Sequence, residues 1–320
     1  MHLKPRVLYC WYKNILSDYK EDIKSGKWVK DKIDIIDNDT GEIIKQKPVY
    51  IANSDNIGSD MTIDDKQIGK DTFTIMTNHK TGKIALLVET IKGNELKEAA
   101  KYLGDKINQI KNISSDMSPT YLKFCEEMFP DSTIIIDKFH VVKHVLEVLQ
   151  SIRLKIKNQL LEKLPKGKKL NKENSYILSD LELLKRSKYL LMKSQSDWND
   201  YQKEIMKTVF FKFNELKIAY NLTEKFKQRF DKSNCKKHRL TLEKELFKWY
   251  DEVENSKIIE FKSVIRLIEK HENRILNYFS NAITNAKAEN MNAKIQRFII
   301  NNYGIRDKDF ALYRIANYFS

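Results

Sequence analysis

The stretch from Ile113 to Val145 constrains the fold most, because its pattern alternates between strand and helix. Pro119 suits the first turn of a helix, and apolar residues then recur at helical spacing until Pro130. The β-branched run Thr133–Ile136 has no polar alternation, which is typical of a strand buried on both faces of a mostly parallel sheet. The pattern therefore predicts strand, helix, strand, helix, and an α/β fold.

Two carboxylates end the two strands predicted in this stretch, Asp116 and Asp137. Ligands of open α/β sheets bind outside the carboxyl ends of the strands, so these acids are candidates for a metal site. The alternative is that each acid only caps the helix that follows it, and spacing alone favours this alternative.

The same stretch contains an ordered set of residues: Asp116-Met117-Ser118-Pro119-x-Tyr121, then Phe129-Pro130, then Asp137-Lys138-Phe139-His140-Val141-Val142-Lys143. This set resembles the middle motif of DDE-type insertion-sequence transposases, which have an RNase H-like catalytic domain. The resemblance implies that Asp116 is the second of three metal-binding acids. Asp137 and His140 are then expected to shape the strand end and the entry into the next segment.

The region before this motif predicts the strands that such a domain requires. Residues 60–68, 72–77 and 83–90 read as a three-stranded meander, and a helix is predicted over 95–103. Ile63-Asp64-Asp65 resembles the first motif of the family, where an acid follows an apolar residue on the first strand. Period-two alternation places Asp64 and Asp65 on opposite faces, so only one can join the site. We assign Asp64, with Asp65 as the alternative.

Residues 1–57 predict an N-terminal accessory segment with a hairpin around Asp37-Asn38-Asp39-Thr40-Gly41. Relatives of this transposase class often carry a zinc ribbon and a helix-turn-helix here. The three cysteines lie far apart without a C-x-x-C pair, so we expect free thiols and no zinc ribbon. The resemblance then implies the split-frame type, in which a separate polypeptide supplies the N-terminal DNA-binding region, although a truncated chain is the alternative.

A long all-α insertion is predicted over residues 145–278, which divides the RNase H-like domain into 58–144 and 279–320. No proline follows Pro165, and no glycine lies between Gly167 and Gly304. We expect helices near 140–162, 175–194, 197–220, 222–230 and 239–275.

Most of the positive charge lies in this predicted insertion. The chain has a formal charge of +14, and residues 151–280 hold 30 Lys and Arg against 18 Asp and Glu, which is 12 of the 14 excess charges. Clusters such as Lys166-Lys168-Lys169 and Lys225-Lys227-Arg229 could follow a phosphate backbone, although each alone reads more readily as a solvated helix face. The separation of charge between segments favours a polyanionic partner, and the resemblance to transposases implies that this partner is double-stranded DNA.

A polar stripe marks the helix predicted after the insertion. Asn281, Asn285, Glu289, Asn292 and Gln296 recur at spacings of three and four, which places them on one helix face. Within and after this stripe, a set of residues resembles the third motif of the same transposases: Ser280-Asn281-Ala282, Asn285, Glu289, Asn292 and then Tyr303-Gly304-Ile305-Arg306. The resemblance implies that Glu289 is the third acid and that Asn285 supports it. The residues that we expect to hold DNA phosphates nearby are Lys287, Asn292, Lys294 and Arg297.

Three carboxylates in one site repel one another unless cations neutralise them, and oxygen ligands select Mg²⁺ or Mn²⁺. Two such ions can activate an attacking oxygen and stabilise the leaving oxygen of a phosphodiester. The expected protein is a bacterial transposase that cuts and joins DNA, acts as a homodimer and is cytoplasmic, associated with the nucleoid when bound to DNA. The alternatives are an RNase H-like nuclease without strand transfer and a catalytically idle, basic DNA-binding remnant of a transposase.

Overall fold

The chain forms two compact units in a computed structural model that describes residues 4–25, 31–37, 39–164, 172–281, 286–302, 304–305 and 307–320. The sheet unit comprises residues 1–137 and 283–320, and the helical unit comprises residues 138–282. The helical unit begins before the predicted residue 145 and ends after the predicted 278. The physical reason is that helix α5 (Lys138–Glu162) and helix α10 (Lys262–Asn281) both continue through the predicted boundaries.

The sheet unit is built on a seven-stranded mixed sheet with the order β1-β2-β5-β4-β3-β6-β7. Its strands are β1 Asp31–Ile36, β2 Ile43–Ala52, β3 Asp60–Ile68, β4 Asp71–Asn78, β5 Ile84–Val88, β6 Asn112–Ser115 and β7 Thr133–Ile136. Strands β1 to β5 pair antiparallel, whereas β6 is parallel to both β3 and β7. A meander followed by parallel strands confirms the RNase H-like fold that the sequence predicts.

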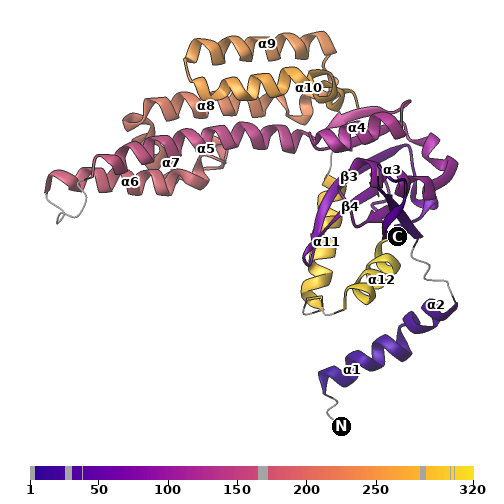
Figure 1. The fold of residues 1–320 in the computed structure, drawn as a ribbon. Coiled ribbons are helices and arrows are strands. Elements are labelled where there is room, and N and C mark those ends of the chain that lie inside the picture. Colours follow the sequence, from indigo (N-terminus) through magenta and orange to yellow (C-terminus); the bar gives the residue numbers. More distant parts are fainter. Residues whose placement is uncertain are drawn as a thin grey trace. The chain divides into compact units, whose positions relative to one another are not determined.

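Helices cover both faces of this sheet (Figure 1). Helices α3 (Gly93–Ala100) and α4 (Pro119–Met128) pack on one face. Helices α11 (Ala286–Asn301) and α12 (Lys308–Phe319) pack on the other. The buried core on the second face contains residues from strands and helices that are distant in sequence, among them Phe73, Ile75, Leu87, Met291, Ile295 and Leu312.

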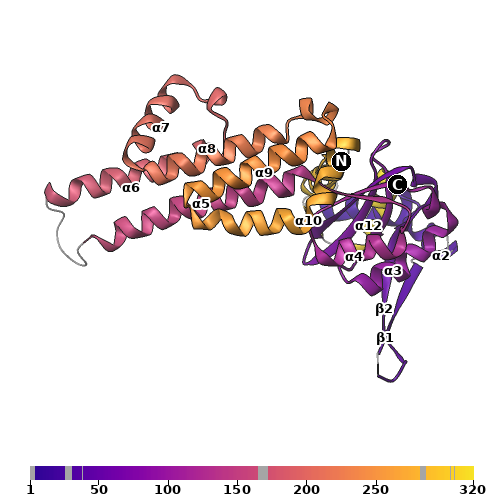
Figure 2. The same ribbon diagram turned by 90° about the horizontal axis from the view of Figure 1, so that it is seen from above.

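The hairpin of the predicted N-terminal lead-in or accessory segment, residues 1–57, is part of the same sheet. Strand β2 pairs with β5, and the β1–β2 hairpin extends beyond the rest of the unit (Figure 2). Ahead of the hairpin, helices α1 (Pro5–Trp11) and α2 (Tyr19–Ser25) are short. The buried ring of Tyr19 packs against Phe310 and Tyr313 of α12. Both parts of the segment are therefore held by contacts to the sheet unit.

The helical unit consists of long helices that lie side by side, including α5, α8, α9 and α10 (Figure 2). Besides α5 and α10, they are α6 Lys172–Leu190, α7 Asp200–Lys212, α8 Asn214–Arg229 and α9 Arg239–Ser256. None of the helices in the described ranges combines the length and the apolar character that spanning a membrane requires.

Two helix breaks in this unit differ from the sequence prediction. The helix expected over 197–220 ends at Phe213 (φ −122°, ψ 76°), and the one expected over 239–275 is interrupted at Lys257 (φ 59°). Neither break contains a proline or a glycine, so no local signal announces it. Packing of the neighbouring helices around fully buried side chains such as Trp249 and Phe261 overrides local helix propensity at these points.

Candidate active site

Asp64 and Asp116 occupy equivalent positions on two neighbouring parallel strands. The register pairs Asp60 with Asn112 and Thr62 with Ser114, so the same offset brings position 64 level with position 116, directly after β6. Neighbouring strands of a sheet lie about 4.8 Å apart. The backbones of Asp64 and Asp116 therefore lie next to each other in the sheet. Such a position would allow both carboxylates to bind one ligand.

Asp64 and Asp65 lie on opposite faces of the sheet, as the alternation predicts. Asp64 pairs with Ile75, which packs in the core that includes Met291 of α11. Asp65 pairs with Thr74, whose hydroxyl lies 3.0 Å from the hydroxyl of Tyr121 on α4. Asp64 thus belongs to the face that α11 covers.

Asp64 binds the helix that carries the candidate third acid. Its Oδ2 accepts a hydrogen bond of 2.8 Å from Asn292 Nδ2, and its Oδ1 accepts one of 2.9 Å from the backbone N–H of Asp65. Asn292 lies three residues after Glu289 on α11, and residues three apart are neighbours on one helix side. The fold therefore brings the third motif to the first motif across 228 residues of sequence.

Asp116 does not act as the cap of helix α4. The N-cap residue is Ser118, and its side chain makes no capping hydrogen bond. Asp116 Oδ1 instead accepts the backbone N–H of Ser118 at 2.9 Å, which fixes the turn between β6 and the helix. Asp137, after β7, is buried, and its backbone N–H donates to Ser115 O at 3.0 Å. This bond fixes the end of β7 against the strand that leads to Asp116.

Three aspartates of the first two motifs influence the pKa of the Tyr121 hydroxyl. Burial raises the pKa of Tyr121, the hydrogen bond to Thr74 lowers it, and the negative charges of Asp65, Asp116 and Asp64 raise it further. Its hydroxyl lies 3.0 Å from that of Thr74, so Tyr121 belongs to the face of the sheet that carries Asp65.

Glu289 is exposed on α11. Within the described residues, no three His, Cys, Asp or Glu side chains come close enough together to hold a metal ion. The structure thus brings together Asp64, Asp116 and the helix that bears Glu289. Convergence of all three carboxylates stays a prediction.

The other predicted site residues divide into several groups. Asn285 and the side chain of Lys287 lie outside the described residues. Lys294 and Arg297 are exposed on α11, and at about 100° per residue they lie roughly 140–160° around the helix from Asn292. His140 lies on α5 in the helical unit, with its ring 5.7 Å from that of Phe139. DNA contact by Lys287, Lys294 and Arg297 stays a prediction.

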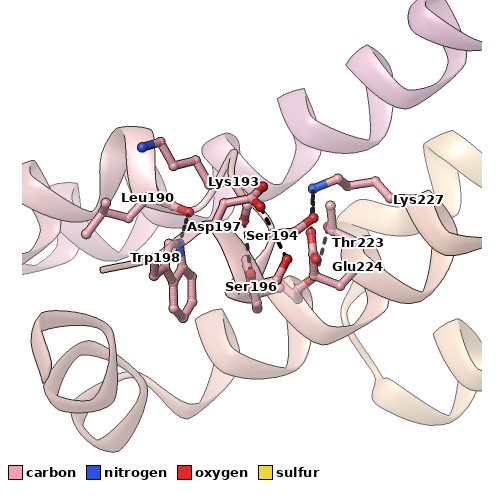
Figure 3. Close-up of polar contacts among 11 residues, drawn as sticks. Leu190, Lys193, Ser194, Ser196, Asp197, Trp198, Thr223, Glu224 and Lys227 are labelled. Atoms are coloured by element: carbon pink, nitrogen blue, oxygen red, sulfur yellow. Dashed lines mark hydrogen bonds and ion pairs between the residues drawn. The ribbon is translucent and has the colours of Figure 1, made fainter. Parts of the chain in front are cut away.

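Several basic residues of the helical unit are paired with acids or backbone oxygens. Lys227 Nζ lies 2.6 Å from Glu224 Oε1 and 3.1 Å from Ser194 Oγ (Figure 3). Lys225 pairs with Glu252 at 2.8 Å, and Arg229 donates to the backbone oxygens of Glu245 and Lys225. This cluster therefore stabilises the packing of the unit, while Lys166-Lys168-Lys169 lies outside the described residues.

The chain contains an RNase H-like domain of the transposase class. This class is defined by the strand order of the sheet, by the neighbouring Asp64 and Asp116, and by helix α11, which packs on the same sheet. The match to known families is more specific. The chain belongs to the ISL3 family of DDE transposases, because the model of that family, described as a transposase, matches residues 61–315. The match begins in β3, ends in α12 and includes the helical unit, so this unit is part of the family's architecture. No curated protein and no solved structure matches the chain.

Proposed function

We propose that this transposase cleaves DNA strands at the ends of an insertion sequence and joins them to target DNA by in-line phosphodiester displacement. The observation that carries the proposal is that Asp64 on β3 and Asp116 directly after the parallel strand β6 occupy equivalent positions. Asn292 of α11 donates a hydrogen bond to this same Asp64. Two acids from different motifs at one point of an RNase H-like sheet are suited to share a divalent ion.

The residues present fit hard divalent cations. Asp64 and Asp116 supply carboxylate oxygens, and Asn292 Oδ1 is a buried amide oxygen that accepts no hydrogen bond from the described part of the chain. Carboxylate and amide oxygens are the donors that Mg²⁺ and Mn²⁺ prefer. We propose Asp64, Asp116 and Glu289 as the residues that hold two such ions. When bound, these ions supply an activated attacking oxygen and stabilisation of the leaving oxygen.

The substrate follows from the family and from the distribution of charge. The helical unit carries the excess of Lys and Arg counted above, and such charge binds a phosphate backbone largely without sequence preference. We propose double-stranded DNA, both insertion ends and target, as the substrate and a homodimer as the assembly that acts on it. Recognition of the ends by a separate polypeptide stays a prediction.

A strand-transfer assay tests this proposal. The purified chain is incubated with labelled end DNA and a target plasmid in Mg²⁺ or Mn²⁺, and the products are resolved on denaturing gels. The expected result is nicked ends and label joined to the plasmid, both absent in EDTA. Nicked ends without joined label would favour a nuclease that lacks strand transfer. Products that form without metal would overturn the proposal. The absence of any product would also overturn it and would favour an idle DNA-binding remnant.

A further inference from the structure

The amide group of Asn292 makes a direct side-chain contact between the third motif and the first. Its Nδ2 donates to Asp64 Oδ2 at 2.8 Å and lies 3.4 Å from the backbone oxygen of Asp65. Its Oδ1 is buried without a hydrogen-bond partner among the described residues. The oxygen end of the amide is thus buried and the donor end is already used within the site, which argues against the predicted contact of Asn292 with a DNA phosphate.

The surroundings of Asn292 explain why this contact is well placed. Met291 and Ile295, on either side of it in sequence, are buried against Ile75 and Ile68 of the sheet. The apolar face of α11 therefore fixes the position of the helix on the sheet and its rotation about its own axis. Asn292 lies at the border of this face. A polar side chain at that border can reach the strand without being exposed to water.

A hydrogen bond to an ionised group is stronger than one between neutral groups and restricts the rotation of the carboxylate. The bond from Asn292 complements the one from the N–H of Asp65, so both oxygens of Asp64 are oriented by the protein. A buried amide oxygen with no donor is costly unless something else binds it. A divalent cation held by Asp64 would supply a partner for this oxygen.

The geometry points to Asn292 as the positioning residue of the metal site: it orients Asp64 and fixes α11 so that Glu289, one turn earlier, approaches the two aspartates. This inference rests on the proposed function, because it assumes that Asp64 holds a divalent ion. It goes further by giving Asn292 a role in metal affinity and none in DNA binding. Groups that orient metal ligands typically contribute 10- to 100-fold to affinity.

Binding of Mn²⁺ to the full chain, measured by calorimetry or electron paramagnetic resonance, tests the inference without relying on activity. Asn292→Ala is expected to weaken Mn²⁺ binding about 10- to 100-fold. It is also expected to leave affinity for DNA in EDTA unchanged. Gln296→Ala is the matched control, since Gln296 is an exposed amide one turn further along α11, and it is expected to change neither quantity.

Asn292→Asp provides a second, independent measurement. It places a carboxylate beside Asp64, so the thermal unfolding temperature in EDTA is expected to fall below that of the wild type and to recover when Mn²⁺ is added. If Asn292→Ala binds Mn²⁺ as tightly as the wild type, or if it loses DNA affinity in EDTA, the positioning role is wrong. If the wild type itself binds no Mn²⁺, the proposed function fails first and the positioning role fails with it.

Discussion

Asp64 on β3 and Asp116, directly after the neighbouring parallel strand β6, are 52 residues apart, which is the same offset that the register of the two strands shows. Two carboxylates at such a position repel each other in the absence of a cation, so the pair is a candidate site for a divalent ion. The chemistry of the chain can therefore be tested by removing one charge at a time.

Asp116→Asn is expected to abolish cleavage and strand transfer while the fold and affinity for end DNA are retained. The amide keeps the size of the side chain and its ability to accept the N–H of Ser118, but it removes one charge from the metal site. Without metal, the variant is expected to be equally stable or more stable, by on the order of 1 kcal/mol, because a like-charge contact is relieved. Gel assays of cleavage and urea unfolding measure the two effects.

Asp65→Asn is the matched control for this variant. Asp65 pairs with Thr74 on the face opposite to Asp64, so the change is expected to leave most of the activity intact. An inactive Asp65→Asn together with an active Asp64→Asn would instead place the site on the face of α4.

Glu289→Gln is expected to reduce cleavage by more than about 100-fold, because a ligand contributes more than the outer partners that orient it. Glu289 is exposed, so stability in EDTA should be unchanged. The comparison variant is Glu98→Gln, which removes a half-exposed carboxylate from α3 of the same unit. Equal cleavage by both variants would mean that Glu289 does not complete the site.

Tyr121→Phe is expected to reduce stability by about 0.5–1.5 kcal/mol at neutral pH, the usual net value of one hydrogen bond. The loss stays small because Thr74 Oγ1 keeps its bond of 2.5 Å to the backbone oxygen of Thr90. Urea unfolding of the two proteins at pH 7 measures this difference.

The stability difference between the wild type and Tyr121→Phe is also expected to depend on pH. The pKa of Tyr121 is raised in the folded chain above its ordinary value of 10.0, so above pH 10 the unfolded chain loses this proton first. The stability that Tyr121 contributes is present below pH 10 and is lost as the pH rises from there. The wild type should therefore lose more stability than Tyr121→Phe between pH 9 and pH 11. Parallel declines would show that the hydroxyl ionises normally in the folded chain.

The affinity for non-specific DNA should reside mainly in the helical unit. Its two ends lie near each other, since Lys138 Nζ is 5.6 Å from the centre of the Tyr278 ring, so a short linker can replace residues 138–282. The wild type should lose affinity steeply with salt, and the deletion variant should bind weakly with a shallower slope of log K against log salt. Fluorescence anisotropy at several salt concentrations measures both slopes.

The complementary protein, the insertion of about residues 145–278 alone, should retain much of the non-specific affinity of the full chain. If it does not bind DNA at low salt while the deletion variant binds as the wild type does, the phosphate contacts lie in the sheet unit instead.

The order of strands and helices was predictable from the sequence because it depends on local patterns. The β-branched run Thr133–Ile136 and the alternating run Asp60–Ile68 are strands with the predicted bounds. The helix beginning at Pro119 and the turn that carries Asp116 likewise follow from residue types a few positions apart. Alternation alone also separated Asp64 from Asp65.

Only the tertiary structure decided which of these elements meet. Helix α11 reaches β3 because Met291 and Ile295 fill the sheet core, and only then does Asn292 bond to Asp64. The breaks at Phe213 and Lys257 depend in the same way on packing between helices. Contacts between residues hundreds of positions apart are set by the burial of complementary apolar surfaces, and no local pattern in one segment records the shape of its distant partner.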